Sequence, residues 1–255
     1  FKLAEREREQ YREILEDLPA YVCVVFAYDT VEFKPNGQMR KLADTIKKRA
    51  QVLEFSKQSE RDLCVWIARH FRAAGKTISD KLASYLVFLT GGGMTQLAGE
   101  IEKISAYATG AEIQRSDIDA VVTPVLNAQT FDISNAIAAG NFQLALEKLQ
   151  ELSAMQAEPI AILGAVGSQL RRLYYARTLT ACGKGQAAFM EMTGNKSSYA
   201  ANLTFSAAKN VSDEFCAHAV QLCLQADRDM KRSADDPERI LEILVAELSQ
   251  EARRG

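Results

Sequence analysis

A helical hairpin is the feature that most constrains what this chain can fold into. Apolar residues recur at helical spacing on both sides of Gly140-Asn141. They are Phe131, Ile133, Ala136 and Ile137 before the glycine, and Phe142, Leu144, Ala145, Leu146, Leu149 and Leu152 after it. Because glycine readily adopts the left-handed backbone that closes a helix, we expect two helices that fold back on each other. The hairpin carries no catalytic chemistry, but the chain before it differs in character from the chain after it.

Two apolar runs near the start of the chain predict strands. Ala20–Tyr28 is β-branched and aromatic, and it has the length of a strand buried on both faces. A polar loop over Asp29–Gly37 and a helix over Gln38–Ala50 lead to a second short strand, Val52–Phe55, which completes one βαβ unit. One such unit is too little sheet to be stable by itself, so we expect further strands outside this chain. Since the chain begins with Phe and not Met, we expect a piece of a longer polypeptide.

After the second strand the periodicity is helical, and we predict a mostly α fold. Ser59 is expected to cap the first of four helices that end at Pro124, and Ser116-Asp117 to cap the fourth. These four helices would form a small domain of about 70 residues. Beyond the hairpin, Pro159 is expected in the first turn of a long helix. Further helices are predicted over Gln186–Met192, Ser206–Val211 and Ser212–Lys231, and after Pro237.

The composition limits the classes of function. The formal net charge is −2, so a contact with nucleic acid would have to come from a local basic patch. Five scattered cysteines, mostly at apolar positions, predict buried thiols in a reducing compartment. No apolar run approaches the roughly 20 residues of a membrane span, and no signal peptide opens the chain. We therefore expect a cytoplasmic location.

Two glycine-containing segments suggest phosphate or anion binding, and a structural role is expected for both. Gly75–Thr77 reads Gly-Lys-Thr but lacks the earlier glycine of a phosphate loop, because His70 holds that position. The segment also follows a helix, where a phosphate loop would follow a strand. Gly91–Gly93 fits a turn between helices as well as an anion site at the next helix N-terminus.

No group of residues predicts a metal site or an active site. Cys216, His218 and Cys223 fall within one helix, but their spacing does not gather them as zinc ligands. The chain has two histidines, so a histidine-based hydrolase is poorly supported. We expect no catalytic, cofactor-binding or metal-binding residues, and no cofactor.

Two basic clusters are the candidate contact sites. The first lies on the helix between the predicted strands, and it could contact a phosphate backbone, of DNA for example, or an acidic partner. Its members are Arg40, Lys41, Lys47, Lys48 and Arg49. The second lies on the long helix after Pro159 and could contact another subunit; its members are Arg171, Arg172 and Arg177. A solvated helix face is the alternative explanation for both clusters.

The order of these segments resembles the delta subunit of the bacterial DNA polymerase III clamp loader, and the similarity covers nearly the whole chain. In the first part of the chain, the matching segments are Tyr21–Phe26 and Val52–Phe55 for two core strands, and Arg40-Lys41-Leu42 with Lys47-Lys48 for the basic crossover between them. In the lid, they are Trp66-Ile67, Gly75 and Ile78 for the first helix and its exit, and Leu97–Tyr107 for an L-x-x-E-[LI]-x-K-[LI]-x-x-Y segment. In the collar, they are Phe131–Gly140 and Asn141–Leu149 for its start, and Leu170-Arg171-Arg172-Leu173 and Ala226-Asp227…Lys231 for later helices. Gly91–Gly93 departs from the family, which usually has one glycine with polar neighbours there.

The resemblance implies three domains: the C-terminal part of an AAA+ α/β domain over residues 1–56, a helical lid domain over 57–127 and a helical collar domain for oligomerisation over 128–255. It implies a subunit without ATPase activity that opens the sliding clamp and helps to load it on primed DNA. Such a subunit has no catalytic site of its own, although it serves a DNA polymerase (nucleotidyltransferase) holoenzyme. The implied partners are the ATPase and delta-prime types of loader subunit, the sliding clamp and primer–template DNA, with no membrane.

The clamp-gripping helix of that family lies in the N-terminal half of the AAA+ module, which this chain lacks, so no clamp-binding residue can be named. Two alternatives stay open. One is an ATP-hydrolysing AAA+ loader subunit whose phosphate loop lies upstream, and the other is a helical adaptor protein with no role in replication. A glycine-rich loop ending in Gly-Lys-Ser/Thr in the upstream sequence would favour the ATPase.

Overall fold

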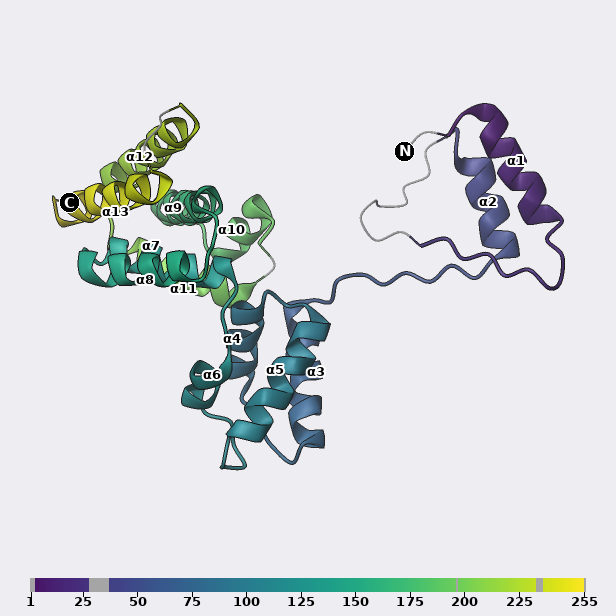
Figure 1. The fold of residues 1–255 in the computed structure, drawn as a ribbon, viewed down its shortest axis with the longest axis horizontal. Helices are drawn as coiled ribbons and strands as arrows, with labels where there is room; N and C mark the ends of the chain where they lie inside the picture. The colour runs from purple at the N-terminus through teal and green to yellow at the C-terminus, as the bar shows by residue number, and fades with distance from the viewer. Residues whose placement is uncertain (1–2, 28–36, 196, 233–235, 255) are drawn as a thin grey trace. The chain divides into compact units, whose positions relative to one another are not determined.

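The chain forms two compact units, Phe1–Lys57 and Gln58–Gly255, in a computed structural model that describes residues 3–27, 37–195, 197–232 and 236–254. The regular elements of the described residues are helices, labelled α1 to α13 (Figure 1). The prediction of a mostly α fold is confirmed.

The smaller unit contains two helices that pack on each other, α1 (Glu5–Glu16) and α2 (Arg40–Arg49). Leu15 of α1 and Leu42 of α2 are each 6% exposed and form the centre of this contact. The apolar face of α1 is only partly buried, because Ile14 is 56% exposed.

The two predicted strands are absent from the described residues of this unit. Residues 22–27 and Val52–Phe55 form no β-ladder, and Val25 and Phe55 are 81% and 92% exposed. A strand is stabilised by hydrogen bonds and side-chain contacts with a neighbouring strand, and in the described part of the unit neither segment has one. The prediction of a βαβ unit is therefore wrong for these residues. Tyr28 and all of the predicted loop except Gly37 lie outside the described residues.

The larger unit begins with a group of four helices that we call the four-helix bundle. Its members are α3 (Glu60–Ala73), α4 (Asp80–Thr90), α5 (Met94–Tyr107) and α6 (Arg115–Val121). As predicted, Ser59 caps α3, since its side chain accepts a hydrogen bond from the Asp62 N–H. Fully buried Ile67, Phe71, Leu86 and Leu97 lie in the core of the bundle.

The predicted cap of the last helix in this bundle is wrong in position. Helix α6 begins at Arg115, after Gln114, and not after Ser116-Asp117. The Asp117 carboxylate still takes part, because it lies in the first turn and accepts a hydrogen bond from the Gln114 N–H at 2.8 Å. It therefore satisfies a backbone donor from inside the helix, which a search for a preceding cap residue misses.

The hairpin is present at the predicted place. Helix α7 (Leu126–Ala138) is followed by Gly140, whose φ is +64°, and α8 (Phe142–Ala154) begins two residues later. The Asn141 N–H donates to the Ala136 carbonyl at 2.8 Å, and the Asn141 side chain accepts from the Leu144 N–H at 3.1 Å. The apolar stripes are largely buried as expected; Leu144 is the exception, at 39% exposed.

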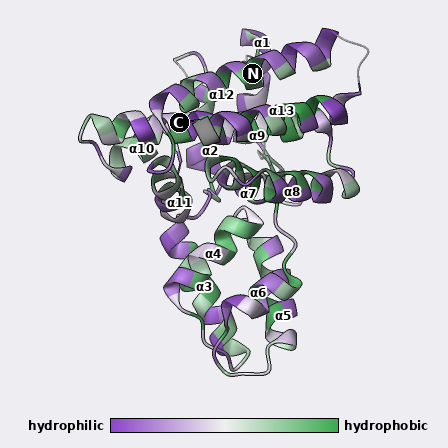
Figure 2. Cartoon of the chain, turned by 90° about the vertical axis from the view of Figure 1, so that its left-hand side faces the viewer, coloured by the Kyte–Doolittle hydropathy of each residue, from purple (hydrophilic) through white to green (hydrophobic). Residues whose placement is uncertain are grey.

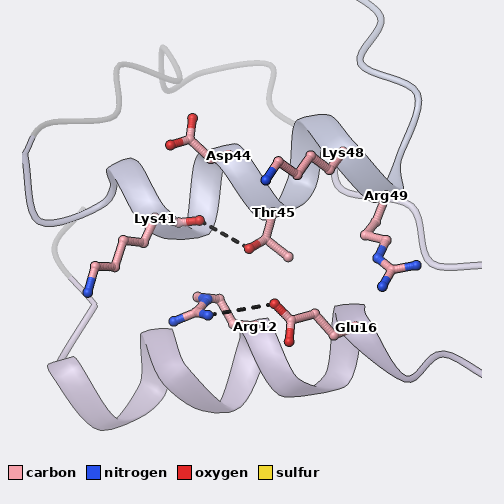
Figure 3. A pocket seen from close by; sticks show the side chains of 7 residues that line it. All are labelled: Arg12, Glu16, Lys41, Asp44, Thr45, Lys48 and Arg49. Atoms are coloured by element: carbon pink, nitrogen blue, oxygen red, sulfur yellow. Dashed lines mark hydrogen bonds and ion pairs between the residues drawn. The ribbon is translucent and has the colours of Figure 1, made fainter.

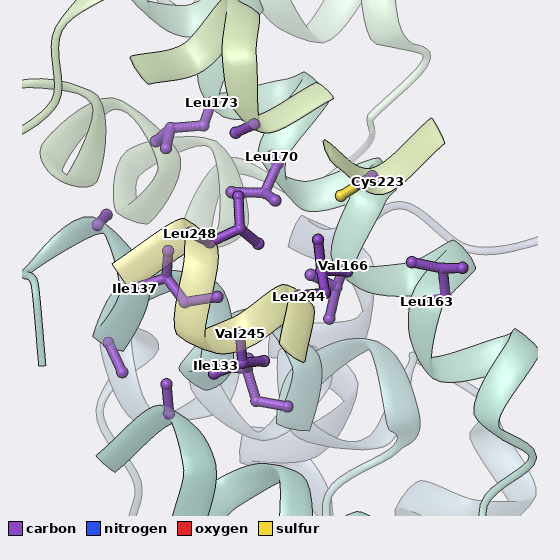
Figure 4. Packing of buried hydrophobic residues seen from close by; sticks show 14 of the residues in the cluster. Ile133, Ile137, Leu163, Val166, Leu170, Leu173, Cys223, Leu244, Val245 and Leu248 are labelled. Atoms are coloured by element: carbon purple, nitrogen blue, oxygen red, sulfur yellow. The ribbon is translucent and has the colours of Figure 1, made fainter. Parts of the chain in front are cut away.

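Helices α7 and α8 join five further helices in what we call the seven-helix bundle. These are α9 (Pro159–Ala181), α10 (Gln186–Thr193), α11 (Ser198–Ala208), α12 (Asp213–Arg232) and α13 (Pro237–Arg254). Pro159 occupies the first turn of α9, as predicted. The core is one cluster of apolar side chains at the centre of the bundle, with Val166, Leu170 and Leu248 among its members (Figure 4).

The predicted position of one helix in this bundle is wrong. The prediction was Ser206–Val211, whereas α11 runs from Ser198 to Ala208. The buried residues of α11 are Ala201, Thr204 and Ala208. Because these side chains are small or hydroxylated, they give only a weak apolar periodicity in the sequence. The Ser197 side chain caps it by accepting from the Ala200 N–H at 3.1 Å.

Hydrophobic and hydrophilic stretches alternate along the helices of the larger unit (Figure 2). This is the pattern of amphipathic helices, each of which buries one face. None of the described helices combines the length and apolar character needed to span a lipid bilayer.

Candidate nucleic-acid and subunit interfaces

The basic cluster of the smaller unit lies on the exposed surface of α2. Because Leu42 and Ala43 face α1 and are buried, the long cationic side chains are directed to the remaining surface. All five predicted residues are exposed: Arg40, Lys41, Lys47, Lys48 and Arg49. The helix therefore presents cations over much of its circumference.

A cleft of about 390 Å³ lies between α1 and α2 and brings part of the cluster together. It is lined by Lys41, Lys48 and Arg49 of α2 and by Arg12 of α1 (Figure 3). The sequence analysis missed Arg12, since only the packing of two helices from distant parts of the chain shows that they share a cleft. Of the predicted cluster, Arg40 and Lys47 do not line it.

Two carboxylates and a hydroxyl complete the lining of this cleft, those of Glu16, Asp44 and Thr45. Arg12 is held by Glu9 at 2.8 Å and by Glu16 at 3.6 Å, so its charge is largely balanced within α1. Asp44 points away from α1 (Figure 3). The Thr45 hydroxyl is used locally, because it donates to the Lys41 carbonyl at 3.1 Å.

The cations of α2 itself are available for a partner. Within the described part of the chain, no carboxylate lies within ion-pair distance of the charged groups of Lys41, Lys48 or Arg49. Exposed lysine and arginine side chains of this kind can neutralise phosphates. The arrangement can therefore bind an anion.

The three arginines predicted on the long helix α9 do not act as one group. Arg177 forms an ion pair with Asp213 of α12 at 3.0 Å and so connects two helices of the same bundle. Arg172 is half-buried, and this burial, together with the neighbouring Arg171 charge, lowers its pKa. Arg171 is exposed. It is the member of the predicted set that is directed to solvent.

The Gly75–Thr77 segment is a helix C-cap, as expected. Gly75 has a φ of +72°, and the Lys76 N–H donates to the Phe71 carbonyl at 2.8 Å, which closes α3. The Lys76 ammonium is occupied, since it donates to the Ala108 and Gly110 carbonyls at 2.6 and 2.7 Å. It thus stabilises the end of α5 and does not face a phosphate site.

The glycine turn between α4 and α5 is a packed connection. Gly91 and Gly92 are consecutive residues with φ of +74° and +79°, a backbone region that residues with a Cβ rarely adopt. A Cβ on Gly92 would also lie 3.3 Å from Cδ1 of Leu63. These contacts explain the glycines without a bound anion.

Cys216, His218 and Cys223 are not brought together. Cys216 and Cys223 are buried in the apolar core, whereas His218 is exposed and lies 3.3 Å from the Glu251 carboxylate. In the described ranges, no group of three or more metal-ligating side chains is found. Burial raises the pKa of both thiols to about 11, so they are core residues in their protonated form.

This burial predicts two classes of thiol. At pH 8, we expect Cys23 and Cys182, which are exposed, to react with Ellman's reagent about 100-fold faster than the buried Cys64, Cys216 and Cys223. A raised pKa reduces the reactive thiolate at this pH, and the core also blocks access. Absorbance at 412 nm measures both phases, and Cys182→Ser should remove half of the fast one. A third fast thiol would contradict the buried positions.

A further cluster lies where the two bundles meet, and the sequence analysis missed it. The Tyr85 hydroxyl of α4 donates to Asp119 of α6 at 2.6 Å, and the guanidinium of Arg115 lies 4.4 Å from the centre of the Tyr85 ring. The Tyr199 ring of α11 lies 5.7 Å from that of Tyr85. These residues are far apart in sequence and follow no shared motif, so no local signal could have identified them.

Comparisons with known proteins identify the kind of chain that carries these features. Residues 127–248, most of the seven-helix bundle, match the family model described as "DNA polymerase III delta subunit, C-terminal domain". The chain is a relative of the DNA polymerase III delta subunit. It is similar to the DNA polymerase III subunit delta of Bacillus subtilis (strain 168), with 21% identity over 255 residues that cover 97% of this chain and 73% of that protein.

Two other proteins extend the comparison. The probable DNA polymerase III subunit delta of Aquifex aeolicus (strain VF5) is 25% identical over 135 residues, which are 52% of this chain and 39% of that protein. Among solved structures, the Bacillus subtilis DNA clamp loader delta protein has the same fold, with a TM-score of 0.62 and 21% identity over 95% of this chain and 70% of that chain. These similarities support a clamp-loader role in DNA replication for this chain.

Proposed function

We propose that this chain acts in a bacterial clamp loader as a subunit that opens the sliding clamp and helps to load it on primed DNA, without hydrolysing ATP. The observation that carries the proposal is the match of residues 127–248 to the delta C-terminal domain, in a chain whose fold resembles a clamp loader delta protein over 95% of its length. Its one Gly-Lys-Thr segment serves as a helix cap, which fits a subunit that depends on others for ATP hydrolysis.

The proposed domains follow from the same relationship. Residues 1–56 would be the end of an AAA+ domain, residues 57–127 the lid and residues 128–255 the collar. The four-helix and seven-helix bundles have separate apolar cores, which supports treating them as two domains. The collar would assemble with the ATPase and delta-prime types of loader subunit, and Arg171, exposed on α9, is a proposed contact.

We assign α2 as the contact with primer–template DNA. Its cations are exposed and, in the described residues, free of carboxylate partners, so they can neutralise phosphates without first breaking an ion pair. The sliding clamp is a proposed partner through residues upstream of this chain.

Assembly tests the proposal. We expect the full-length protein, mixed with the ATPase and delta-prime subunits of its own organism, to elute as one complex of defined mass in size-exclusion chromatography with light scattering. With ATP, that complex should bind the sliding clamp. The protein alone should hydrolyse no ATP above the buffer rate. Separate elution of the components would count against a loader subunit, and ATP hydrolysis by the protein alone would favour an ATPase.

A further inference from the structure

The two bundles of the larger unit have separate cores, and few residues connect them. One apolar cluster contains residues of α3 to α6 and the other contains residues of α7 to α13, except that Ala128 from the start of α7 belongs to the first. Apart from the chain connection itself, the most extensive contacts between the bundles are those of α4 with α7 and with α11. The orientation of one bundle on the other therefore depends on a small surface.

An aromatic group forms the centre of this surface. The Phe88 ring of α4 lies 5.5 Å from the Phe131 ring of α7, edge to face, and 5.4 Å from the Tyr199 ring of α11. Tyr199 also contacts Tyr85, one turn earlier on α4, with ring centres 5.7 Å apart. Such ring pairs at these distances are favourable and have preferred geometries. Helix α4 is thus held by two different helices of the seven-helix bundle.

The position of Tyr85 is fixed within its own bundle. Its hydroxyl donates to Asp119 at 2.6 Å, and the Arg115 guanidinium lies over its ring and forms an ion pair with Asp119 at 3.3 Å. The ring that meets Tyr199 is therefore already ordered. Tyr199 is half-buried; this burial raises the pKa of its phenol, and the Arg115 charge partly offsets the rise.

A second contact lies beside the rings, on a different helix. The Ser198 hydroxyl, at the start of α11, donates to the Glu60 carboxylate at 2.9 Å, and Glu60 lies in the first turn of α3. Two consecutive residues of α11 thus reach two helices of the four-helix bundle. A single contact would still allow one bundle to rotate about it relative to the other, whereas contacts with two helices restrict that rotation.

Helix α11 is at the same time firmly part of the seven-helix bundle. Ala201, Thr204 and Ala208 are buried, and the helix packs on α9, α10 and α7. The first turn of α11 contacts the four-helix bundle, and its remaining turns pack within the seven-helix bundle. Figure 1 shows α11 next to the end of the bundle where α4 lies.

We propose that α11 is a strut that fixes the orientation of the four-helix bundle on the seven-helix bundle, and that the Tyr199 ring is its principal contact. In this arrangement the chain connection between α6 and α7 does not set the orientation alone. A force that acts on one bundle is transmitted to the other through α11, without a change in either core.

Distances between spin labels test this proposal. The labels are placed at the exposed positions Arg69 of α3 and Glu247 of α13 as Arg69→Cys and Glu247→Cys, in a full chain whose exposed cysteines are replaced by Cys23→Ser and Cys182→Ser. Double electron–electron resonance then gives the distribution of distances between the bundles. We expect one narrow distribution in this parent, and a distribution about twice as wide after Tyr199→Ala.

Two control variants separate the ring contact from other effects. Tyr199→Phe keeps the ring and should leave the distribution narrow. Tyr175→Ala removes an exposed tyrosine of α9 that has no ring partner in the described part of the chain, and it should also leave the width unchanged. A narrow distribution for Tyr199→Ala, or equal broadening in Tyr175→Ala, would overturn the proposal.

Circular dichroism shows whether both bundles stay folded. If Tyr199→Ala lowers the helix content, Tyr199→Leu takes its place, because leucine retains apolar volume in the first turn of α11 but cannot form the ring pairs. Broadening in Tyr199→Leu with full helix content supports the strut, and a distribution as narrow as the parent's rejects it.

Discussion

Replacing Leu248 with alanine is expected to lower the free energy of unfolding of the seven-helix bundle by about 3–4 kcal/mol. Leu248 on α13 is fully buried, and its side chain lies close to Leu170 of α9 (Figure 4). Helix α13 packs on α7, α8, α9 and α12, so a cavity there is shared by several helices and cannot close by the shift of one. Urea unfolding followed by circular dichroism measures the change.

Ile243→Ala is the matched control for this substitution. Ile243 is on the same helix but is 50% exposed, so its truncation removes little buried surface and should cost less than about 1 kcal/mol. Hydrogen exchange locates the effect: protection should fall in residues of α7 to α13 after Leu248→Ala. If both variants were equally stable, α13 would not be packed as described.

Removal of three cationic side chains from α2 is expected to weaken DNA binding strongly. In the assembled loader, the triple variant Lys41→Gln, Lys48→Gln and Arg49→Gln should bind primed DNA about 10–100-fold more weakly at low salt, because three phosphate contacts are lost. The slope of log affinity against log salt concentration should fall by about 3. Fluorescence anisotropy with a labelled primer–template at several salt concentrations measures both quantities.

A triple variant on α3 is the control, because it has the same change in net charge. Arg61, Arg69 and Arg72 are exposed, and no ion pair is found for them in the described residues. Their replacement by glutamine should leave the salt slope unchanged. If both triple variants weakened binding equally, the effect would be one of net charge and not of the α2 surface. An unchanged affinity in the α2 variant would reject α2 as the DNA contact.

Helices were predictable from the sequence because their signals are local. The hairpin at Gly140-Asn141 depends on a left-handed glycine and on apolar spacing within a few turns, and both are found as expected; the structure adds a cap by the Asn141 side chain. Strands are harder to predict from local sequence, because a strand also depends on hydrogen bonds to a neighbouring strand. Residues 20–28 have the composition of a buried strand, but the described residues contain no partner strand, and residues 22–27 form no strand and are exposed.

In the candidate sites, too, local features could be predicted from the sequence and contacts between distant segments could not. The sequence correctly identified α2 as a basic exposed helix, but it could not assign Arg12 to the same cleft or pair Arg177 with Asp213. It also gave no indication of Tyr199 as a contact between bundles, since a lone tyrosine at a helix start is unremarkable until its three-dimensional neighbours are known. Properties that depend on contacts between distant segments require the structure.

The glycine turn between α4 and α5 has a consequence for how sequences of this kind can diverge. Two adjacent left-handed residues and the close approach of the Leu63 side chain make any residue other than glycine strained at position 92, so the geometry of the turn itself restricts mutation there. A relative with a larger residue at this point must have moved Leu63 or rebuilt the turn. The pair Gly91-Gly92 therefore serves as a sequence marker for this particular path from α4 into α5.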